Sequence, residues 1–306
     1  DVDPKLMFDH YLYKSSTAKK FVEHFDSAAQ NYIDSFNLND KSLVIDIGSN
    51  DGIGIKYFNH KKINAIGIEP AKNLAELANS NGIKTINSYF TEAIADKIIE
   101  ENGYADLVLG SNVFAHSDDL YGLAKNALKL LKKDGVLIIE VQYFIENLKK
   151  GDFDNIYHEH FNYWNLHTLK AFFKKLKYSI SKVEKIDTHG GSIRVYVEKN
   201  HKLNDKSVDK ILDEEKTFGI NNHKKLSVYT EKIISKRALA LRKINEFKKL
   251  NYKVVGYGSP AKATTLLNFF GINSNHIDYV IEDNPLKVNK IIPGTGIKII
   301  SKKELN

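Results

Sequence analysis

The chain contains no cysteine, and it has one methionine and one tryptophan among its 306 residues. The lack of cysteine excludes disulfide bonds, cysteine-bound zinc and thiol catalysis within these residues. No apolar run approaches the ~18 residues that a membrane-spanning helix needs, and no signal-peptide pattern opens the chain. These absences favour a cytoplasmic protein. Because the chain starts at Asp1 and its methionine is Met7, we also expect a processed or shortened product.

Positive charge is in excess, which gives a formal net charge of +7. Nucleic-acid binding is one interpretation of such a balance. Much of the excess, however, is lysine spread along helical stretches such as residues 224–249, a pattern that is more typical of a solvated surface. The positive potential also favours an anionic small substrate such as a nucleotide diphosphate.

Short apolar segments alternate with helical segments from residue 41 onward. Continuous apolar strands in this arrangement predict a parallel sheet that is covered by helices on both faces. Two further strand-like segments, 178–187 and 192–199, are separated only by THGG and therefore predict an antiparallel hairpin at the sheet edge. Five parallel strands and such a pair resemble the class I methyltransferase sheet of the α/β class. The five strands are expected at 42–48, 64–70, 84–87, 105–112 and 135–142.

Three segments are expected along the chain. Residues 1–40 read as a helical N-terminal segment, residues 41–200 as a cofactor-binding α/β domain, and residues 201–306 as a helical linker with a smaller α/β lobe. That lobe is too short to be a complete doubly wound domain, so we expect it to dock on the first. Within the larger domain, a helix is expected over 120–135, with Lys132, Lys133 and Gly135 at its end.

The loop after the first strand, DIGSNDG at 46–52, fits the D-x-G-x-x-x-G pattern of S-adenosylmethionine (SAM) enzymes. Glycine lets the backbone approach a ligand closely and adopt a positive φ. The dinucleotide spacing G-x-G-x-x-G is not met, and Asp51 would lie where a pyrophosphate binds. An acidic loop instead suits a ligand that carries ammonium and sulfonium cations.

Glu69 ends the second strand, a position from which an acidic residue commonly accepts the ribose hydroxyls of a nucleotide cofactor. The alternative is a tight turn without a ligand, in which Asn50 or Asp51 caps the following helix; it leaves Glu69 unexplained. The residues predicted to bind SAM lie on this loop and at the ends of the second and fourth strands: Asp46, Gly48, Ser49, Asn50, Gly52, Glu69, Ser111 and Asn112.

The run YHEHFNYW at 157–164 concentrates proton-handling side chains, since two histidines, a glutamate and a tyrosine occupy four consecutive positions. Each of these groups needs a polar partner once it is buried, so core packing alone rarely explains such a run. In a regular strand His158 and His160 would share one face and Tyr157 and Glu159 the other. We therefore predict an irregular segment in which Tyr157, Glu159 and His160 converge, and a structural role for His158 through a backbone hydrogen bond.

Four stretches together resemble the SAM-dependent sugar C-methyltransferases, which methylate carbon 3 of thymidine-diphosphate-linked 4-keto-deoxysugars. They are YLYKSST at 11–17, NVFAHSDD at 112–119 together with YHEHFNYW, HGGSIR at 189–194, and GYGSPAKATTLLN at 256–268. Members of that family usually carry an N-terminal zinc module built on cysteines, and these residues contain none.

The resemblance implies a set of catalytic roles. His160 corresponds to the general base, Tyr157 and Glu159 to residues that help hold the sugar, and His116 to a histidine beside the reacting centre. Tyr11 corresponds to a tyrosine that closes over the site, with the nearby Tyr13 as the alternative and a substrate contact. The same resemblance implies that the C-terminal lobe helps to bind the nucleotide end.

The GYGSPAK motif reads as a strand, a loop and a helix N-terminus, with Ser259 as N-cap and Pro260 in the first helical turn. Such a terminus with Lys262 nearby can bind an anion, for which a diphosphate is the natural candidate. The alternative is an ordinary helix cap with a solvated lysine. In HGGSIR the glycines suit a hairpin turn, Arg194 is a candidate substrate contact, and the role of His189 stays open.

These features predict a SAM-dependent C-methyltransferase that acts on a nucleotide-diphosphate keto-deoxysugar, without a metal, nucleic acid or membrane as partner. The carbon next to a ketone is a weak acid, and a histidine with a pKa near 6.5 suits its deprotonation. One alternative is an O- or N-methyltransferase for a related sugar or small metabolite. A second is a basic nucleic-acid-binding module, against which Asp46, Asp51 and Glu69 argue.

Overall fold

The computed structural model describes residues 4–9, 11, 13–188, 190–199 and 205–304, and it divides the chain into two compact units. We call residues 1–144 and 161–217 the N-terminal unit, and residues 145–160 and 218–306 the C-terminal unit. This division differs from the three expected segments, because residues 145–160 group with the end of the chain and residues 1–40 do not form a unit of their own.

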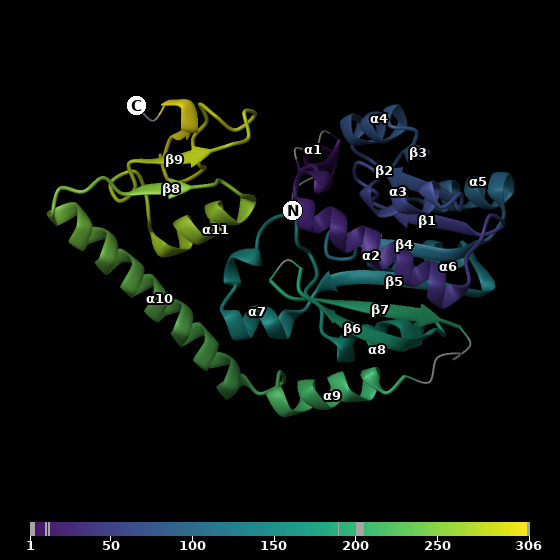
Figure 1. Cartoon of the computed structure of the whole chain (residues 1–306). Helices are drawn as coiled ribbons and strands as arrows, with labels where there is room; N and C mark the ends of the chain where they lie inside the picture. Colours follow the sequence, from purple (N-terminus) through teal and green to yellow (C-terminus); the bar gives the residue numbers. More distant parts are fainter. Residues whose placement is uncertain (1–3, 10, 12, 189, 200–204, 305–306) are drawn as a thin grey trace. The chain divides into compact units, whose positions relative to one another are not determined.

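A seven-stranded sheet forms the centre of the N-terminal unit, in the order β3-β2-β1-β4-β5-β7-β6 (Figure 1). The first five strands run parallel, whereas β7 is antiparallel to both β5 and β6. The predicted α/β class and edge hairpin are thus confirmed. The strands are Leu43–Ile47 (β1), Asn64–Glu69 (β2), Thr85–Asn87 (β3), Ala105–Ser111 (β4), Leu131–Gln142 (β5), Ser179–Ile186 (β6) and Ser192–Glu198 (β7).

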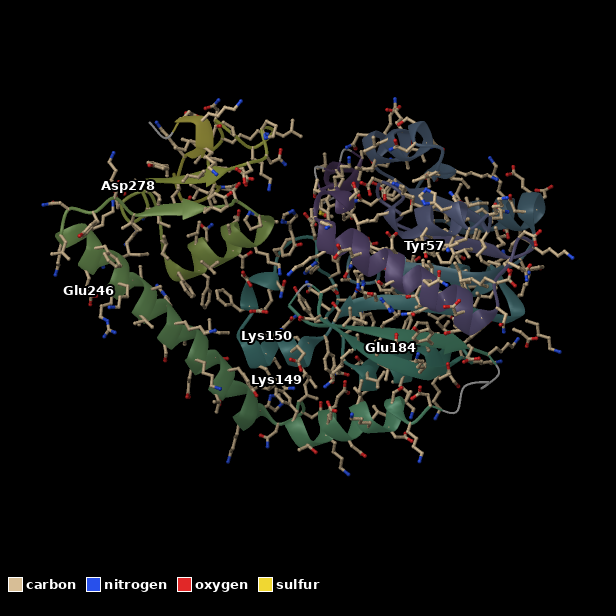
Figure 2. All side chains as sticks on the ribbon, viewed as in Figure 1. Tyr57, Lys149, Lys150, Glu184, Glu246 and Asp278 are labelled. Atoms are coloured by element: carbon tan, nitrogen blue, oxygen red, sulfur yellow. The ribbon has the colours of Figure 1, made fainter. Side chains whose placement is uncertain are left out.

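Helices cover the sheet of the N-terminal unit. Ala28 and Tyr32 of α2 and Phe58 of α3 are buried in one apolar cluster with Val44 and Leu107 of the strands. At the rim of that cluster Tyr57 donates a hydrogen bond of 2.8 Å to Gln30, which joins α3 to α2 (Figure 2 labels Tyr57). The helices are Pro4–Phe8 (α1), Lys19–Phe36 (α2), Ile53–His60 (α3), Lys72–Ser80 (α4), Glu92–Asn102 (α5), Leu120–Lys129 (α6), Leu166–Lys175 (α8) and Ser207–Phe218 (α9), with a 3-10 turn at Ser15–Thr17.

The helix expected over 120–135 ends earlier than predicted. α6 stops at Lys129, and β5 begins at Leu131, which lies opposite Ala105 of β4. Lys132 reaches the carboxylate of Asp106 at 2.7 Å and so holds this stretch alongside β4. Lys132, one of the lysines that suggested a helix end, therefore serves the start of a strand.

The C-terminal unit is built on a three-stranded parallel sheet, in the order β10-β9-β8. Buried Leu267, Phe270 and Ile297 form its core. Phe153 stacks on Phe269 and Phe270, with ring centroids 4.9 and 5.5 Å away, which explains why the segment before the YHEH run groups with this unit. Its elements are Phe144–Lys150 (α7, which starts at the unit boundary), the 3-10 turn Phe153–Asn155, His223–Lys249 (α10), Val255–Tyr257 (β8), Ala261–Phe270 (α11), Tyr279–Glu282 (β9), Ile299–Ser301 (β10) and the 3-10 turn Lys302–Glu304.

The long helix α10 carries exposed charges, among them Glu246, which pairs with Lys243 at 3.1 Å (Figure 2 labels Glu246). Near its end Lys248 pairs with Asp278, whose carboxylate also accepts the backbone N–H of Val254 at 2.9 Å. Much of the lysine excess is thus accounted for by solvated helix surface. Within the described part of the chain, no helix is long and apolar enough to cross a membrane.

Candidate active site

The loop between β1 and α3 has the tight conformation that its glycines suggested. Gly48 and Gly52 have φ angles of +68° and +81°, and the N–H groups of Gly48 and Ser49 both bond to the carbonyl of Ile68. A Cβ on Gly48 would lie 2.6 Å from the Val113 side chain, so only glycine fits between β1 and the loop that follows β4. The N-cap of α3 is Gly52, and no side chain caps it, which argues against Asn50 or Asp51 as a simple helix cap.

Three carboxylates surround this loop. Burial, with the charge of Glu69 as the second cause, raises the pKa of Asp46 to about 8. Burial also raises the pKa of Glu69, although its carboxylate accepts the N–H groups of Ala71 and Asn50 at 2.8 Å each. Asp51 is buried as well. Burying this much acidity without a cation nearby is unfavourable, so the loop suits a positively charged ligand.

Two buried polar atoms of the loop fit the cofactor that the sequence predicts. Among the described residues, neither Asp51 Oδ1 nor Ser49 Oγ has a hydrogen-bond partner. Orphaned acceptors of this kind commonly mark a site for an absent ligand or water. The ammonium group and ribose hydroxyls of SAM are donors that such acceptors, together with the Glu69 carboxylate, can receive.

Residues 11 and 13–16, which we call the N-terminal strap, include three that contact this loop. Asn50 donates to the carbonyl of Tyr13 at 3.1 Å and accepts the N–H of Ser15 at 3.0 Å. Asp51 accepts the N–H of Ser16 at 3.3 Å. Asn50, a predicted SAM contact, and its neighbour Asp51 thus hold the strap, and Tyr13 lies directly beside the loop.

Tyr11 belongs to the same strap and is fixed through its backbone. The side chain of Asn73, in the first turn of α4, accepts the N–H of Tyr11 and donates to its carbonyl, at 3.2 and 2.9 Å. Phe8 stands between Tyr11 and His116, with ring centroids 5.6 and 5.8 Å away. The structure thereby brings Tyr11, Tyr13 and His116 to one aromatic cluster at the edge of the SAM loop.

The end of β4 carries Ser111 and Asn112, and Asn112 adopts a positive φ of 58° while its N–H bonds to the carbonyl of Glu140 at 2.7 Å. This turn redirects the chain into the loop that holds His116. Ala115, just before His116, accepts the N–H groups of Phe161 and Asn162 at 2.8 and 3.2 Å. Phe161 and Asn162 thus hold the loop of His116 within the N-terminal unit.

The YHEH run is irregular, as predicted, and forms a turn closed by the His160 N–H on the carbonyl of Tyr157 at 3.0 Å. The rings of Tyr157 and His160 lie 4.4 Å apart between centroids. Nδ1 of His160 lies 2.8 Å from the carbonyl of Asn155. His158 is half-exposed and faces the Glu159 carboxylate at 3.9 Å, where we had expected a backbone partner. The turn thus joins Tyr157 to His160 and Glu159 to His158.

Arg194 occupies a different environment from the one expected of a substrate contact. Its guanidinium is buried and pairs with Glu140 at 3.0 Å and with Glu184 at 3.4 Å (Figure 2 labels Glu184). Glu140 also accepts hydrogen bonds from His24 and Thr188. Burial alone would raise the pKa of Glu140, but the hydrogen bond from His24 and the charge of Arg194 outweigh it and hold that pKa below its ordinary value. Arg194 is therefore a structural cation, and we do not assign it to the substrate. His189 lies outside the described residues.

The GSPAK segment differs in detail from the predicted helix cap. Pro260, not Ser259, is the N-cap of α11. Ser259 instead gives its N–H and hydroxyl to the carboxylate of Glu282, at 2.8 and 2.5 Å, and its carbonyl accepts the Lys287 ammonium. A carboxylate thus already occupies the donors of Ser259. Burial raises the pKa of Asp154, and the nearby charge of Lys262 partly offsets this, so Lys262 lies on the side of the helix that faces the segment before the YHEH run.

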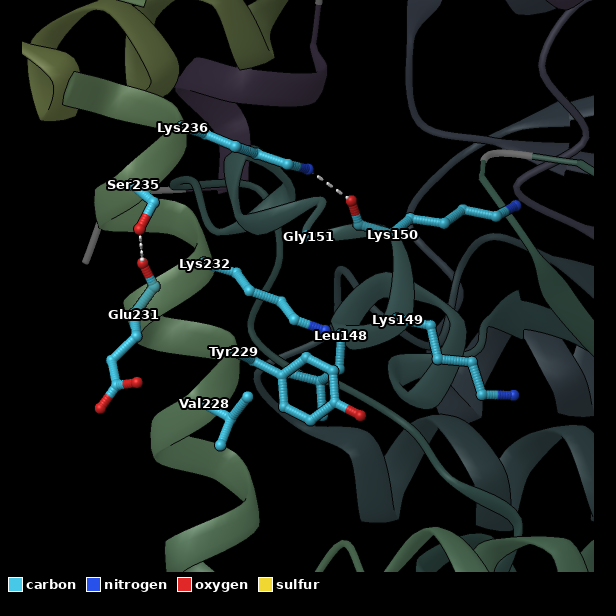
Figure 3. Close-up of a pocket in the computed structure, with 10 residues that line it drawn as sticks. All are labelled: Leu148, Lys149, Lys150, Gly151, Val228, Tyr229, Glu231, Lys232, Ser235 and Lys236. Atoms are coloured by element: carbon cyan, nitrogen blue, oxygen red, sulfur yellow. Dashed lines mark hydrogen bonds between the residues drawn. The ribbon is translucent and has the colours of Figure 1, made fainter. Parts of the chain in front are cut away.

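A groove of about 400 Å³ lies between α7 and α10 of the C-terminal unit (Figure 3). Its lysines do not converge on one point: Lys236 donates to the carbonyl of Lys150, and Lys149 pairs with Glu146. In Figure 3 the side chains of Lys149 and Lys150 extend away from Tyr229 and α10. This arrangement does not form a focused anion site, so the groove is not the candidate active site.

Three asparagines that hold the proposed catalytic residues were missed from the sequence. Asn155 carries no signal in the sequence, because it holds Nδ1 of His160 through its backbone carbonyl, which every residue has. Asn73 carries none either, because the partners of its side chain are backbone groups of Tyr11. Asn162 lies inside the YHEHFNYW run, and a polar side chain two positions after His160 was the available signal.

The sheet order, the acidic loop after β1 and the carboxylate at the end of β2 define a class I SAM-dependent methyltransferase. Residues 21–182 match a family model described as a methyltransferase domain, and residues 187–306 match the C-methyltransferase C-terminal domain. The C-methyltransferase NovU of Streptomyces niveus is 32% identical over 309 residues, which cover 99% of this chain and 73% of that protein. The chain therefore belongs to the C-methyltransferase family.

Two solved structures that resemble this chain have low sequence identity to it. Magnesium protoporphyrin IX methyltransferase of Synechocystis PCC 6803, with bound SAM, has a TM-score of 0.44 and 12% identity over 57% of this chain and 78% of its own. The PH0226 protein of Pyrococcus horikoshii OT3 has a TM-score of 0.47 and 15% identity over 61% of this chain and 94% of its own.

Proposed function

We propose that this C-methyltransferase methylates a carbon atom next to the ketone of a nucleotide-linked keto-deoxysugar, with His160 as the general base. Such a carbon must lose a proton before it can attack a methyl group, and the enolate oxygen that develops must be stabilised. The kinship with C-methyltransferases favours this chemistry over methyl transfer to oxygen or nitrogen. The acidic loop around Asp46 and Asp51 argues against a nucleic-acid-binding module.

The observation that carries the proposal is the hydrogen bond between His160 Nδ1 and the carbonyl of Asn155, 2.8 Å long. A carbonyl can only accept, so Nδ1 carries the hydrogen and the lone pair of the neutral ring lies on Nε2. Nε2 is thus prepared to take the proton from the sugar carbon. The imidazolium that results keeps its Nδ1–H bond to Asn155, which stabilises the charged form.

The remaining groups of the turn and of the β4 loop have supporting roles in this proposal. Tyr157, whose ring contacts that of His160, donates a hydrogen bond to the sugar, and Glu159 holds a sugar hydroxyl. His116 donates a hydrogen bond to the enolate oxygen, and Tyr11 covers the reacting carbon from the N-terminal strap. SAM, when it is bound by the loop residues Ser49, Asn50 and Glu69, supplies an electrophilic methyl group that the carbanion accepts.

The C-terminal unit takes the nucleotide end of the substrate in this proposal. Lys262 is the contact that we favour for the diphosphate, because it is a cation in the first turn of α11, even though its charge also acts on the Asp154 carboxylate. Ser259 is a weaker candidate, since Glu282 occupies its N–H and hydroxyl. The sheet of this unit is parallel, and ligands of parallel sheets bind at the carboxyl ends of the strands, where Ser259 and Lys262 follow β8.

Hydrogen exchange tests the proposal. A thymidine-diphosphate 4-keto-deoxysugar is incubated with the protein in heavy water, with S-adenosylhomocysteine in place of SAM, and deuterium at the carbon next to the ketone is followed by NMR. We expect exchange with the wild-type protein and none with His160→Ala. If the wild-type protein methylates the sugar but never introduces deuterium at that carbon, deprotonation by His160 is refuted.

A further inference from the structure

Residues 161 and 162, which directly follow the YHEH run, donate hydrogen bonds to three backbone carbonyls near His116 in the chain. The N–H groups of Phe161 and Asn162 bond to Ala115 O. The side-chain amide of Asn162 donates to Ser117 O at 2.8 Å and lies 3.4 Å from Phe114 O. The carbonyls on both sides of His116 are therefore held by one residue, Asn162.

The loop that carries His116 depends on this contact for its shape. Phe114 is fully buried and its ring packs against that of Phe173, which anchors the loop on one side. The backbone then turns at His116, whose N–H bonds to Val113 O at 2.9 Å. Beyond that turn Ser117 has a carbonyl that points back to Asn162. Removing the Asn162 amide would take two hydrogen bonds from the segment 114–117 and leave it free to shift.

We propose that Asn162 is a positioning residue for His116: its side-chain amide fixes the loop so that the imidazole faces the reacting carbon. This inference rests on the proposed function, since it takes His116 to act on the enolate. Only a group with two N–H donors at this distance from the backbone can reach both Phe114 O and Ser117 O. Aspartate has the same size but offers only acceptors, and alanine offers nothing.

The alternative is that Asn162 only stabilises the fold, as the N-cap Asn165 does for α8 through its 2.8 Å bond to the Thr168 N–H. The two roles differ in their coupling to His116. If Asn162 acts through His116, its replacement should lower activity little once His116 has been removed. If Asn162 only stabilises the fold, its replacement should lower activity by the same factor with or without His116.

A double-mutant cycle separates the two roles. Turnover of the thymidine-diphosphate 4-keto-deoxysugar is measured for wild type, Asn162→Ala, His116→Ala and the double variant, with Asn165→Ala as the matched control. We expect Asn162→Ala to lower kcat by about 100-fold, the scale of a small displacement in an active site, with the KM for SAM unchanged. In the His116→Ala background the same change should cost no more than about twofold. Equal losses in both backgrounds, or no loss in either, would overturn the inference.

Two further measurements keep the test decisive. Asn162→Asp serves if the alanine variant fails to fold, with SAM binding as the check on its structure. The ring resonances of His116 in histidine-labelled protein should move in the Asn162 variants and stay in place in Asn165→Ala, and unmoved resonances would contradict the inference. This spectrum needs no turnover, so a wild-type protein that does not act on the keto-sugar refutes the proposed function while the role of Asn162 is still tested.

Discussion

The SAM loop and the YHEH turn hold their functional groups by opposite means. At the loop, the carboxylate of Glu69 accepts two backbone N–H groups. The charge of Glu69 also acts on the buried carboxyl group of Asp46. In the turn, a backbone carbonyl receives a side-chain N–H, and His160 is held by Asn155. The first arrangement collects negative charge for a cationic ligand, and the second leaves a neutral ring with one defined lone pair. The contrast teaches that the cofactor site is prepared by the charge of its carboxylates, whereas the proposed base is prepared by the orientation of its ring.

The largest effect that this comparison predicts comes from removing His160, the proposed base whose ring Asn155 orients. His160→Ala should lower turnover by about 10³- to 10⁴-fold, near the upper range for loss of a general base. Within the described turn, Asn155 orients the ring of His160 and not that of His158, so no second imidazole is prepared to take the proton. SAM binding should stay at the wild-type level, since His160 belongs to a different part of the chain from the loop. Steady-state kinetics and calorimetry with SAM measure both quantities.

His158→Ala is the matched control for that variant, because the ring of His158 is half-exposed and adjoins Glu159. It should keep most of the turnover. A His158→Ala variant as inactive as His160→Ala would show that the two imidazoles had been assigned the wrong way round.

The charge of the loop gives the next largest effect. With a pKa of about 8, Asp46 is mostly protonated at pH 7, and a cationic ligand favours the ionised form. Binding of SAM should therefore strengthen as the pH rises through 8, by up to roughly thirtyfold between pH 6.5 and 9 if the bound form is fully ionised. The ratio of wild-type to Asp46→Asn affinity isolates this effect from the titration of the SAM amino group.

Methylthioadenosine, which lacks the amino-acid part of SAM, is the control ligand for that experiment. Its affinity should show little of the pH dependence, since it brings no ammonium or sulfonium group to the loop. A wild-type to Asp46→Asn ratio that stays constant over the whole pH range would exclude Asp46 as the group that the cofactor ionises.

The contrast between the two regions also explains what the sequence could predict. The strands around the loop are continuous apolar runs, and the positions of Gly48 and Glu69 relative to them were enough to predict a SAM loop. The location of residues 145–160 in the C-terminal unit was not predictable, because it depends on Phe153 meeting Phe269 and Phe270 across more than a hundred residues. Arg194 was misjudged for a related reason, since Glu140 and Glu184, which neutralise it, are distant in the chain.

The C-terminal unit offers a smaller effect that bears on the substrate and not on the base. Lys262→Gln should raise the KM for the nucleotide-linked sugar by about tenfold and leave kcat nearly unchanged, because a contact to a remote diphosphate is made equally in the ground state and the transition state. Lys253→Gln, which removes a lysine just before β8 in the same unit, is the control for a general loss of positive charge. An equal rise in KM for both variants would indicate diffuse electrostatic attraction.

The smallest expected effect concerns the N-terminal strap, which is held over the loop by side-chain amides. Asn73→Ala removes both hydrogen bonds to the backbone of Tyr11, each worth about 1 kcal/mol, and should let the strap open more often. We expect cleavage of the strap by a nonspecific protease to speed up several-fold, while the melting temperature falls only slightly because the bonds lie outside the core. Asn81→Ala, at the other end of α4, loses a single bond to Leu77 within the helix and should leave cleavage of the strap unchanged. If the strap is cleaved at the same rate in Asn73→Ala and wild type, then Asp51 and Asn50 alone hold it. In that case the SAM loop would provide negative charge for the cofactor and also fix the position of the strap.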